Sequence, residues 1–512
     1  MILSKGFGSA VFGVDAQIIT IEVNIVNGTK FHLSGLPDNA VKESQHRIES
    51  VFKYFNYRMP RRKVVVNMAP ADIRKEGSAY DLPIALGVLK SSGQINADDM
   101  EKYVIMGELA LDGTLRPIKG ALPIAIETRK KGFKGFILPK ENANEAAIVN
   151  DLDIIGVENL MEAKEFLEGE RKIEPVDYDT RDHFYDNLDK YEADFSNVQG
   201  QENIKRALEI AAAGGHNAIM IGPPGAGKTM LAKRLPSILP PLSLHEALET
   251  TKIHSVAGRL GGNAQLVTQR PFRSPHHTIS DVALVGGGGV PQPGEISLAH
   301  NGILFLDELP EFKRTVLEVL RQPLEERKVT ISRARMSVEF PTNFMLIASM
   351  NPCPCGYYNH PEKECVCGSG QVQRYINKVS GPLLDRIDLH VEVTPVSFDQ
   401  MTQDRKSESS QEIRERVIKA REIQQERFKG KAIHSNAMME SQMVKEVCQI
   451  NDGGKILLKK AMERLGLSAR AYDRILKVSR TIADLAGSED IRIEHLAEAI
   501  QYRSLDREGW AG

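Results

Sequence analysis

Residues 222–229 have the types and spacing of a phosphate-binding loop. The loop comprises Gly222, Pro223, Pro224, Gly225, Ala226, Gly227, Lys228 and Thr229. It follows the apolar run 218–221 and precedes a helix-like stretch, which is the strand-loop-helix context that such a loop requires. The glycines let backbone N–H groups turn toward phosphate oxygens beside the positive end of the following helix. Lys228 is placed to reach the β and γ phosphates and Thr229 to offer its hydroxyl to Mg²⁺, so the loop predicts a site for ATP with Mg²⁺.

Two further apolar runs end in side chains that suit hydrolysis of ATP. The run 302–306 ends in Asp307, which suits the Mg²⁺ shell, and Glu308, which is placed to polarise a water that attacks the γ-phosphate. The run 344–350 ends in Asn351, whose amide is suited to hydrogen-bond that water or the phosphate. Because buried parallel strands bring such residues to one edge of a sheet, the sequence predicts an ATP hydrolase.

Length and composition indicate what kind of protein carries this site. A chain of 512 residues is too long for a single core and indicates about three domains. With 41% hydrophobic and 26% charged residues, and no apolar stretch long enough to span a membrane, we expect a globular, cytoplasmic protein with no membrane partner. The net charge of -2 excludes a globally basic nucleic-acid coat but leaves room for a local basic channel.

The first part of the chain predicts a mixed α/β domain. Alternating apolar runs at 18–26 and 64–68 indicate strands. The stretches 75–85 and 107–118, with the continuation 135–142, resemble the proteolytic domain of Lon, which belongs to the ribosomal-protein-like α/β superfamily.

The resemblance to Lon breaks at the catalytic residues. Lon-type proteolysis needs a serine nucleophile and a lysine base, but alignment puts Ala79 in the place of the serine and Leu122 in the place of the lysine. Ser78 is one position away and Lys119 three positions away. We therefore predict a non-proteolytic relative, with a displaced Ser–Lys dyad as the alternative.

The predicted fold class is α/β, with an α+β Lon-protease-like domain before a P-loop motor and a helical lid. The segment after Phe195 resembles the adenine-contacting segment of AAA+ ATPases. We expect the Lon-like domain over 1–170, an acidic linker over 171–194, the AAA+ core over 195–400 and a helical linker and lid over 401–512.

Two stretches of the motor are candidates for nucleic-acid contact. The loop 270–280 carries Arg273, His276 and His277, which suit phosphate pairing and stacking; a purely structural loop or a metal site are the alternatives. After a predicted helix over 315–324, residues 328–340 alternate as two strands around a basic tip.

Arg333 and Arg335 lie at that tip. Loops at these two places line the pore in hexameric AAA+ motors of the helix-2-insert group, so the resemblance makes both arginines candidates for DNA contact. A charged, solvated edge strand is the alternative.

Three arginines resemble AAA+ residues that act on the γ-phosphate. Arg386 lies in a segment, 380–389, like the one that carries the arginine finger, which reaches into a neighbour's site and implies an oligomer; a surface salt bridge is the alternative. Arg470 lies in a stretch that resembles the sensor 2 region of the lid, and Arg474, one turn later, is the alternative.

Four of the five cysteines are clustered. Cys353, Cys355, Cys365 and Cys367 form two C-x-C pairs with His360 in the gap between them, a set that suits tetrahedral Zn²⁺. Free thiols and a disulfide are the alternatives, and we expect the lone Cys448 to lie in the core.

In this order, the motifs span nearly the whole chain and closely resemble the YifB/ComM family of magnesium-chelatase-like AAA+ ATPases. The resemblance implies a homo-hexameric ring and, for the ComM branch, ATP-driven branch migration on single-stranded or branched DNA in natural transformation. The alternative is a chelatase-like or chaperone-like ATPase that remodels a protein partner.

Overall fold

The computed structural model describes residues 3–186, 191, 193–260, 266–333, 336–358, 360, 362–395 and 407–503. Its chain forms two compact units. The first unit comprises Met1–Asn187, Ser243–Thr268 and Pro291–Pro293, and the second comprises Leu188–Leu242, Gln269–Val290 and Gly294–Gly512. No helix within the described ranges is long and apolar enough to cross a membrane.

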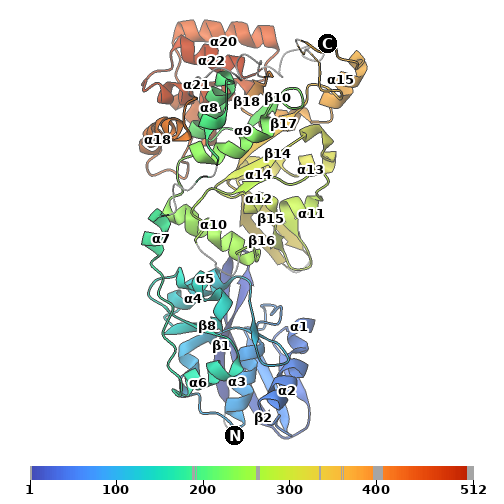
Figure 1. Ribbon diagram of the computed structural model, residues 1–512, viewed down its shortest axis with the longest axis vertical. Helices are drawn as coiled ribbons and strands as arrows, with labels where there is room; N and C mark the ends of the chain where they lie inside the picture. Colours follow the sequence, from blue (N-terminus) through green and yellow to red (C-terminus); the bar gives the residue numbers. More distant parts are fainter. Residues whose placement is uncertain are drawn as a thin grey trace. The chain divides into compact units, whose positions relative to one another are not determined.

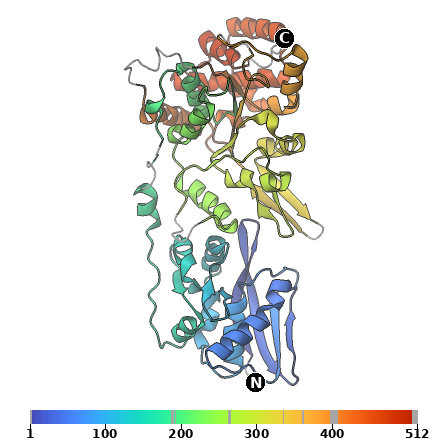
Figure 2. The same ribbon diagram turned by 45° about the vertical axis from the view of Figure 1, so that its right-hand side comes forward.

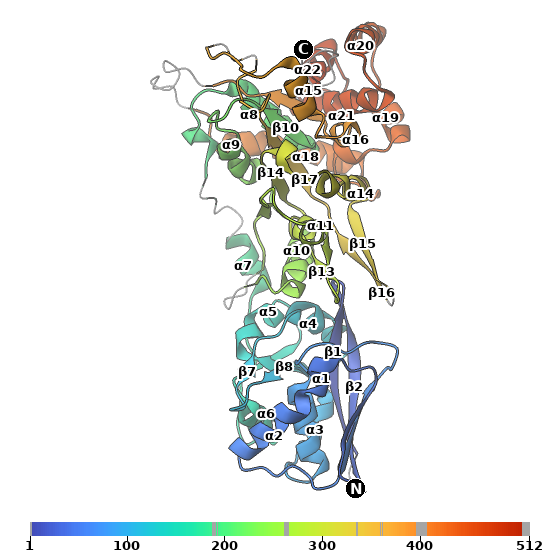
Figure 3. The same cartoon turned by 90° about the vertical axis from the view of Figure 1, so that its right-hand side faces the viewer.

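The first unit is built on a seven-stranded mixed sheet in the order β3-β4-β2-β1-β5-β8-β9. Its strands are β1 (Ser4–Phe12), β2 (Asp15–Val26), β3 (Phe31–Ser34), β4 (Lys63–Ala69), β5 (Tyr103–Ile105), β8 (Gly135–Pro139) and β9 (Asp153–Val157). In β2, Ile19, Ile21 and Val23 are buried, whereas the residues between them are only half-buried. This period of two lets one face carry the core, and helices α3 (Asp81–Ser91) and α4 (Ala121–Lys130) lie against β1 and β2 (Figure 3).

Shorter elements complete the first unit. They are α1 (Asn39–Lys42), α2 (Ser44–Tyr54), β6 (Glu108–Leu109), β7 (Leu115–Arg116), α5 (Ala143–Ala147), α6 (Leu160–Leu167), α7 (Thr180–Asp186), α10 (Leu244–Val256) and β13 (Gln292–Pro293). Helix α7 forms inside the segment expected to be a linker, because Phe184 is buried and the Thr180 hydroxyl donates to the Ile148 carbonyl oxygen at 2.9 Å.

Helix α10 comes from the middle of the chain but packs within the first unit. Its Ser255 hydroxyl donates to Glu145 at 2.5 Å, and Lys252 pairs with Asp15 at 2.7 Å. Ser243 and Glu246 close a capping box at its start. The sequence analysis did not predict this helix, although the Ser-x-x-Glu spacing is a known helix-start signal.

The second unit contains a five-stranded parallel sheet in the order β11-β14-β17-β10-β18 (Figure 1). The strands are β10 (Ala218–Ile221), β11 (Phe272–Arg273), β14 (Ile303–Leu306), β17 (Met345–Met350) and β18 (Leu389–Glu392). All residues of β10, β14 and β17 are buried, as expected for parallel strands covered on both faces. The strand order reverses at β10, and open α/β sheets bind ligands beyond the carboxyl ends of strands at such a point.

Helices surround this sheet and extend beyond it. They are α8 (Glu202–Gly214), α9 (Lys228–Arg234), α11 (Asp281–Val285), α12 (Glu295–Leu298), α13 (Arg314–Glu318), α14 (Arg321–Glu326), α15 (Ser369–Ile376), α16 (Gly381–Leu384), α18 (Ser410–Arg427), α19 (Ser441–Val447), α20 (Asp452–Leu465), α21 (Ala469–Leu485) and α22 (Ile493–Gln501). The last five form the predicted helical region, so the expected fold class is confirmed.

One helix of the core was predicted wrongly. Residues 315–324 were expected to form a single helix, but α13 ends at Glu318 and α14 starts at Arg321. Pro323 explains the break, because it has no N–H to donate to the Val319 carbonyl and its ring would clash with that group in a continuous helix.

The hairpin predicted over 328–340 is confirmed. Strands β15 (Lys328–Arg333) and β16 (Met336–Pro341) pair antiparallel, with Arg333 opposite Met336, and run side by side as the yellow strand pair of Figure 2. Arg335 lies outside the described residues, as does the side chain of Arg333. Their role at the tip therefore stays a prediction.

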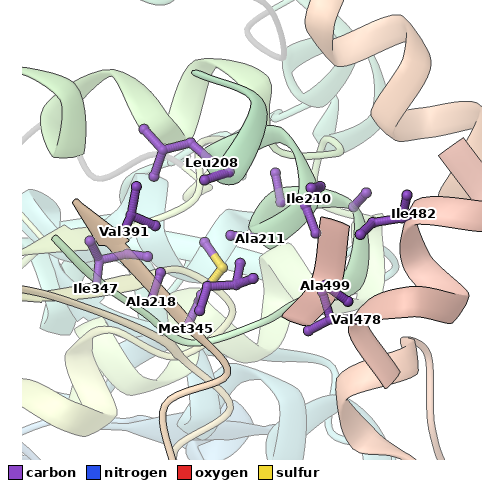
Figure 4. Close-up of a cluster of buried hydrophobic side chains, with 14 of the residues drawn as sticks. Leu208, Ile210, Ala211, Ala218, Met345, Ile347, Val391, Val478, Ile482 and Ala499 are labelled. Carbon is purple, nitrogen blue, oxygen red and sulfur yellow. The ribbon is translucent and has the colours of Figure 1, made fainter. Parts of the chain in front are cut away.

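Helix α8 joins the sheet to the helical region through one hydrophobic core. Leu208 and Ala211 of α8 belong to the same buried cluster as Ile347 of the sheet and Ile482 of α21 (Figure 4). At the end of α8, a Cβ on Gly214 would lie 2.1 Å from His216 Nε2 and 2.6 Å from Thr481 Oγ1. Only glycine therefore lets α8 and α21 approach this closely.

We predict that Gly214→Ala destabilises the second unit by roughly 1–3 kcal/mol, because the added methyl overpacks a filled contact. Thermal unfolding followed by circular dichroism measures the effect. The control is Gly370→Ala on α15, where the nearest atom to the new methyl is Arg374 Nη2 at 4.0 Å. Equal midpoints for the two variants would contradict the prediction.

Candidate nucleotide site

The phosphate-binding loop lies between β10 and α9, at the point where the strand order reverses. Gly225 and Gly227 have φ angles of 78° and 84°, in the left-handed region that favours glycine. A Cβ on Gly222 would lie 2.2 Å from the Val393 carbonyl oxygen. The chain therefore needs glycine at these positions to place the loop at the start of α9, where N–H groups attract anions.

Lys228 is a buried cation within this loop. Its Nζ donates to the carbonyl oxygens of Gly222 at 2.6 Å and Pro223 at 3.0 Å, and to Asn351 Oδ1 at 3.1 Å. Burial lowers the pKa of Lys228, although the nearby charges of Asp307 and Glu308 oppose that shift. These hydrogen-bond acceptors are neutral, so an anionic phosphate fits the site as a partner for the ammonium group.

Asp307 connects three elements at the carboxyl edge of the sheet. Its Oδ2 accepts from the Thr229 hydroxyl at 2.7 Å, and its Oδ1 accepts from the Ser349 hydroxyl. A hydroxyl and a carboxylate are oxygen donors of the kind that Mg²⁺ prefers. The sequence analysis missed Ser349, whose only local signal is one polar residue within the apolar strand β17.

Glu308 has a strained backbone and an exposed side chain. Its φ of 54° is uncommon outside glycine, and strain of this kind clusters at functional sites. The Glu308 N–H donates to Ser349 Oγ at 3.4 Å, while the side chain is 54% exposed. The carboxylate is therefore accessible to water, as a general base must be.

The loop expected to contact nucleic acid, 270–280, lies beside Glu308. His277 Nδ1 lies 3.9 Å from Glu308 Oε2, and the His276 and His277 rings lie tilted against each other with centroids 4.1 Å apart. Arg273 pairs with Glu295 through contacts of 2.7 Å and 2.8 Å, so the fold already holds its guanidinium. His276 is exposed, which leaves it the more accessible member of the predicted set.

The candidate γ-phosphate arginines differ in how closely a carboxylate holds them. Arg386 pairs with Glu325 at 2.6 Å and its side chain is 11% exposed. Arg470 has the more accessible side chain, 65% exposed and 3.8 Å from Asp385 Oδ2. To serve as a finger, Arg386 must first leave Glu325.

Arg474 joins the lid to the core instead. It pairs with the buried Asp388 and its Nε donates to the Asp385 carbonyl oxygen at 2.5 Å. Burial alone would raise the pKa of Asp388, but the charges of Arg474 and His216 hold it below its usual range. Of the two lid arginines, Arg470 is therefore the one available to a nucleotide.

The four clustered cysteines meet around a single point. Cys353, Cys355, Cys365 and Cys367 bring their sulfurs within 4.8 Å of one another. All five cysteines of the chain are free thiols, so the disulfide alternative is wrong, and the four-cysteine cluster could bind Zn²⁺. Cys448 is buried as expected, and burial raises its pKa to about 12.

The Lon-like positions in the first unit do not bring a serine to a lysine. Leu122 is fully buried at the start of α4, and its N–H donates to Glu145 at 2.9 Å. The Ser78 hydroxyl donates to Glu108, whereas the Lys119 side chain lies against Gly258. These contacts agree with a non-proteolytic domain, which stays a prediction.

We predict that Glu308→Gln lowers ATP turnover at least about 100-fold while ATP still binds, because only the base is lost. Phosphate release and fluorescent-nucleotide binding measure the two steps. The control is Glu311→Gln, a nearby acid that pairs with Lys378 at 3.3 Å. Substantial turnover in Glu308→Gln would rule out this glutamate as the base.

We also predict that His277→Ala lowers turnover without DNA by up to about five-fold, since a 3.9 Å contact with the partly exposed Glu308 carboxylate contributes at most about 1 kcal/mol. The matched control is His276→Ala, which removes the neighbouring ring but no contact with Glu308. If both variants hydrolyse ATP at the same rate, His277 does not position Glu308.

Comparison with known proteins assigns the chain to a family. Three family models match the chain: "Magnesium chelatase, subunit ChlI" over residues 194–401, "Subunit ChlI of Mg-chelatase" over 21–142, and "Magnesium chelatase, subunit ChlI C-terminal" over 407–503. The first covers the nucleotide site, and the third covers most of the C-terminal helices.

Individual relatives extend the match to nearly the full length. The chain is 46% identical to competence protein ComM of Haemophilus influenzae, over 99% of this chain and 98% of ComM. It is 45% identical to the protein YifB of Salmonella typhimurium, over 97% of this chain and 96% of YifB. Lon protease 2 of Bacillus subtilis is 32% identical over 28% of this chain and 27% of its own length. The chain therefore belongs to the YifB/ComM family of magnesium-chelatase-like proteins, with a ChlI N-terminal domain, an AAA ATPase motor and a C-terminal domain.

Proposed function

We propose that the protein is a hexameric ATPase that uses ATP hydrolysis to move along DNA, as a branch-migration or helicase motor in competence. The observation that carries this proposal is the full-length similarity to competence protein ComM. The organisation of the ATP site and the position of the hairpin β15–β16 support it.

The residues of the site divide the chemistry of hydrolysis among them. Lys228 and the loop N–H groups bind the phosphates. Thr229 and Asp307 would hold Mg²⁺, which neutralises charge on the transferring phosphoryl group when it is bound. Glu308 takes the proton of the attacking water. Asn351, which already accepts a hydrogen bond from Lys228, orients the attacking water or the γ-phosphate.

Arginines supply the remaining positive charge in this scheme. Arg386 acts on the ATP of a neighbouring protomer, after leaving Glu325, and Arg470 acts from the lid of its own protomer. An arginine finger is typically worth about 10³ to 10⁵ in rate. Because one protomer alone lacks the charge of its neighbour's Arg386, hydrolysis depends on the ring.

One contact links the proposed DNA-contacting loop 270–280 to the ATP site. The loop 270–280 carries His277, whose ring lies 3.9 Å from Glu308, so displacement of the loop by DNA alters the surroundings of the base. The hairpin β15–β16 adds the predicted tip arginines, Arg333 and Arg335. Their contacts with phosphates are electrostatic and therefore depend on salt.

We predict that single-stranded or branched DNA stimulates hydrolysis and that the double variant Arg333→Ala/Arg335→Ala abolishes the stimulation. The assay compares steady-state hydrolysis with no DNA, single strands, duplex and a four-way junction. The salt dependence of DNA binding should also flatten by about one to two counterions.

The matched control is Lys328→Ala, which removes a positive charge from the base of the same hairpin, where Lys328 pairs with Glu339 at 3.0 Å. Hydrolysis that is indifferent to every DNA contradicts the DNA motor. That result favours a chelatase-like or chaperone-like ATPase that remodels a protein partner.

A further inference from the structure

The four-cysteine cluster contacts the phosphate-binding loop. It starts two residues after Asn351, which follows β17 and accepts a hydrogen bond from Lys228. Gly356, inside the cluster, has a φ of 86°, and a Cβ there would lie 2.5 Å from Pro224 Cδ and 3.1 Å from its Cγ. The backbone of the cysteine loop therefore packs directly against the loop that binds phosphate.

A second contact joins the cluster to Asn351. Helix α15 begins two residues after Cys367, and its Val372 and Ile376 pack in the same small core as the cysteines. Burial raises the pKa of Tyr375, on this helix, and the backbone of Asn351 lies close enough to oppose that shift. The cysteines thus hold both the segment before them and the helix after them.

The sulfur positions fit a tetrahedral metal. Cys353 Sγ lies 3.3 Å from Cys355 Sγ and 3.7 Å from Cys365 Sγ, and Cys355 Sγ lies 3.6 Å from Cys365 Sγ. A zinc ion with Zn–S bonds of about 2.3 Å needs sulfur–sulfur spacings of about 3.8 Å. The Tyr358 N–H donates to Cys353 Sγ at 3.3 Å, the kind of outer contact that orients a metal-bound thiolate.

The donor type selects the class of metal. Thiolates are soft ligands that favour Zn²⁺, whereas Mg²⁺ and Ca²⁺ take oxygen ligands. The site is thus chemically distinct from the Mg²⁺ position at Thr229 and Asp307. A closed set of four protein ligands leaves no open position, as in structural zinc sites.

We propose that Cys353, Cys355, Cys365 and Cys367 bind one structural Zn²⁺, and that this zinc holds Asn351 and Pro224 in the geometry that binds ATP. The metal acts by fixing a loop of the second unit and takes no part in hydrolysis. The inference goes beyond the proposed DNA motor and does not depend on it.

The first experiment measures the metal. Elemental analysis of the protein purified without chelators should find one zinc per chain, and Cys353→Ser/Cys365→Ser should lose it. Cys448→Ser, which removes a thiol outside the cluster, should retain it. Substitution with Co²⁺ should give the absorption of a tetrahedral tetrathiolate site. Absence of zinc, or iron in its place, overturns the assignment.

The second experiment tests the link to ATP with all four thiolates intact. Gly356→Ala should keep its zinc but bind a fluorescent ATP analogue at least about ten-fold more weakly, since the methyl displaces Pro224. Gly368→Ala, beside Cys367, meets no atom within 4 Å and has a φ of -68°, so it should match the wild type in zinc and in affinity.

Removal of zinc from the wild-type protein avoids any failure of a variant to fold. Chelation should weaken nucleotide binding, and added Zn²⁺ should restore it. If nucleotide affinity is unchanged both after zinc removal and in Gly356→Ala, the metal does not support the ATP site. Because this readout is nucleotide affinity without DNA, it stays separate from a failure of the DNA-motor proposal.

Discussion

The carboxylate of Asp307 is the constraint on which the rest of the site depends. It accepts hydrogen bonds from the Thr229 hydroxyl at the start of α9 and the Ser349 hydroxyl of β17, and it directly follows β14. One side chain thus sets the spacing of the phosphate-binding loop and two strands. With that spacing set, Lys228 donates a hydrogen bond to Asn351, and the backbone of Glu308 has a φ angle in the left-handed region.

A second set of polar contacts ties the helical lid to the sheet. Buried Asp388, just before β18, holds His216 at 3.3 Å and also pairs with Arg474 of α21. Breaking a buried ion pair costs several kcal/mol, because the remaining charge is left without a partner. These contacts therefore couple the lid to β18, the strand beside β10. Through this coupling, a nucleotide bound at the phosphate-binding loop can affect the lid.

The sequence predicts those features of the site and fold that depend on residues close together in the chain. The loop, Asp307, Glu308, Asn351 and the cysteine pairs are each short local patterns, and apolar runs locate β2, β4, β10, β14, β17 and the helical lid. What it does not predict are partners far apart in the chain. Nothing near Arg273 points to Glu295, and nothing near Gly356 points to Pro224, since only folding brings these residues together. The same holds for His277 and Glu308.

The placement of α10 has a consequence for how this architecture is inherited. The helix is encoded between β10 and β11 of the motor, yet its Ser255 completes the hydrogen bonding of Glu145 in the first unit. A gene cut after residue 187 would encode a first unit that lacks this helix. A single cut in the chain therefore cannot separate the first unit whole from the second, since the first unit is assembled from stretches on both sides of β10.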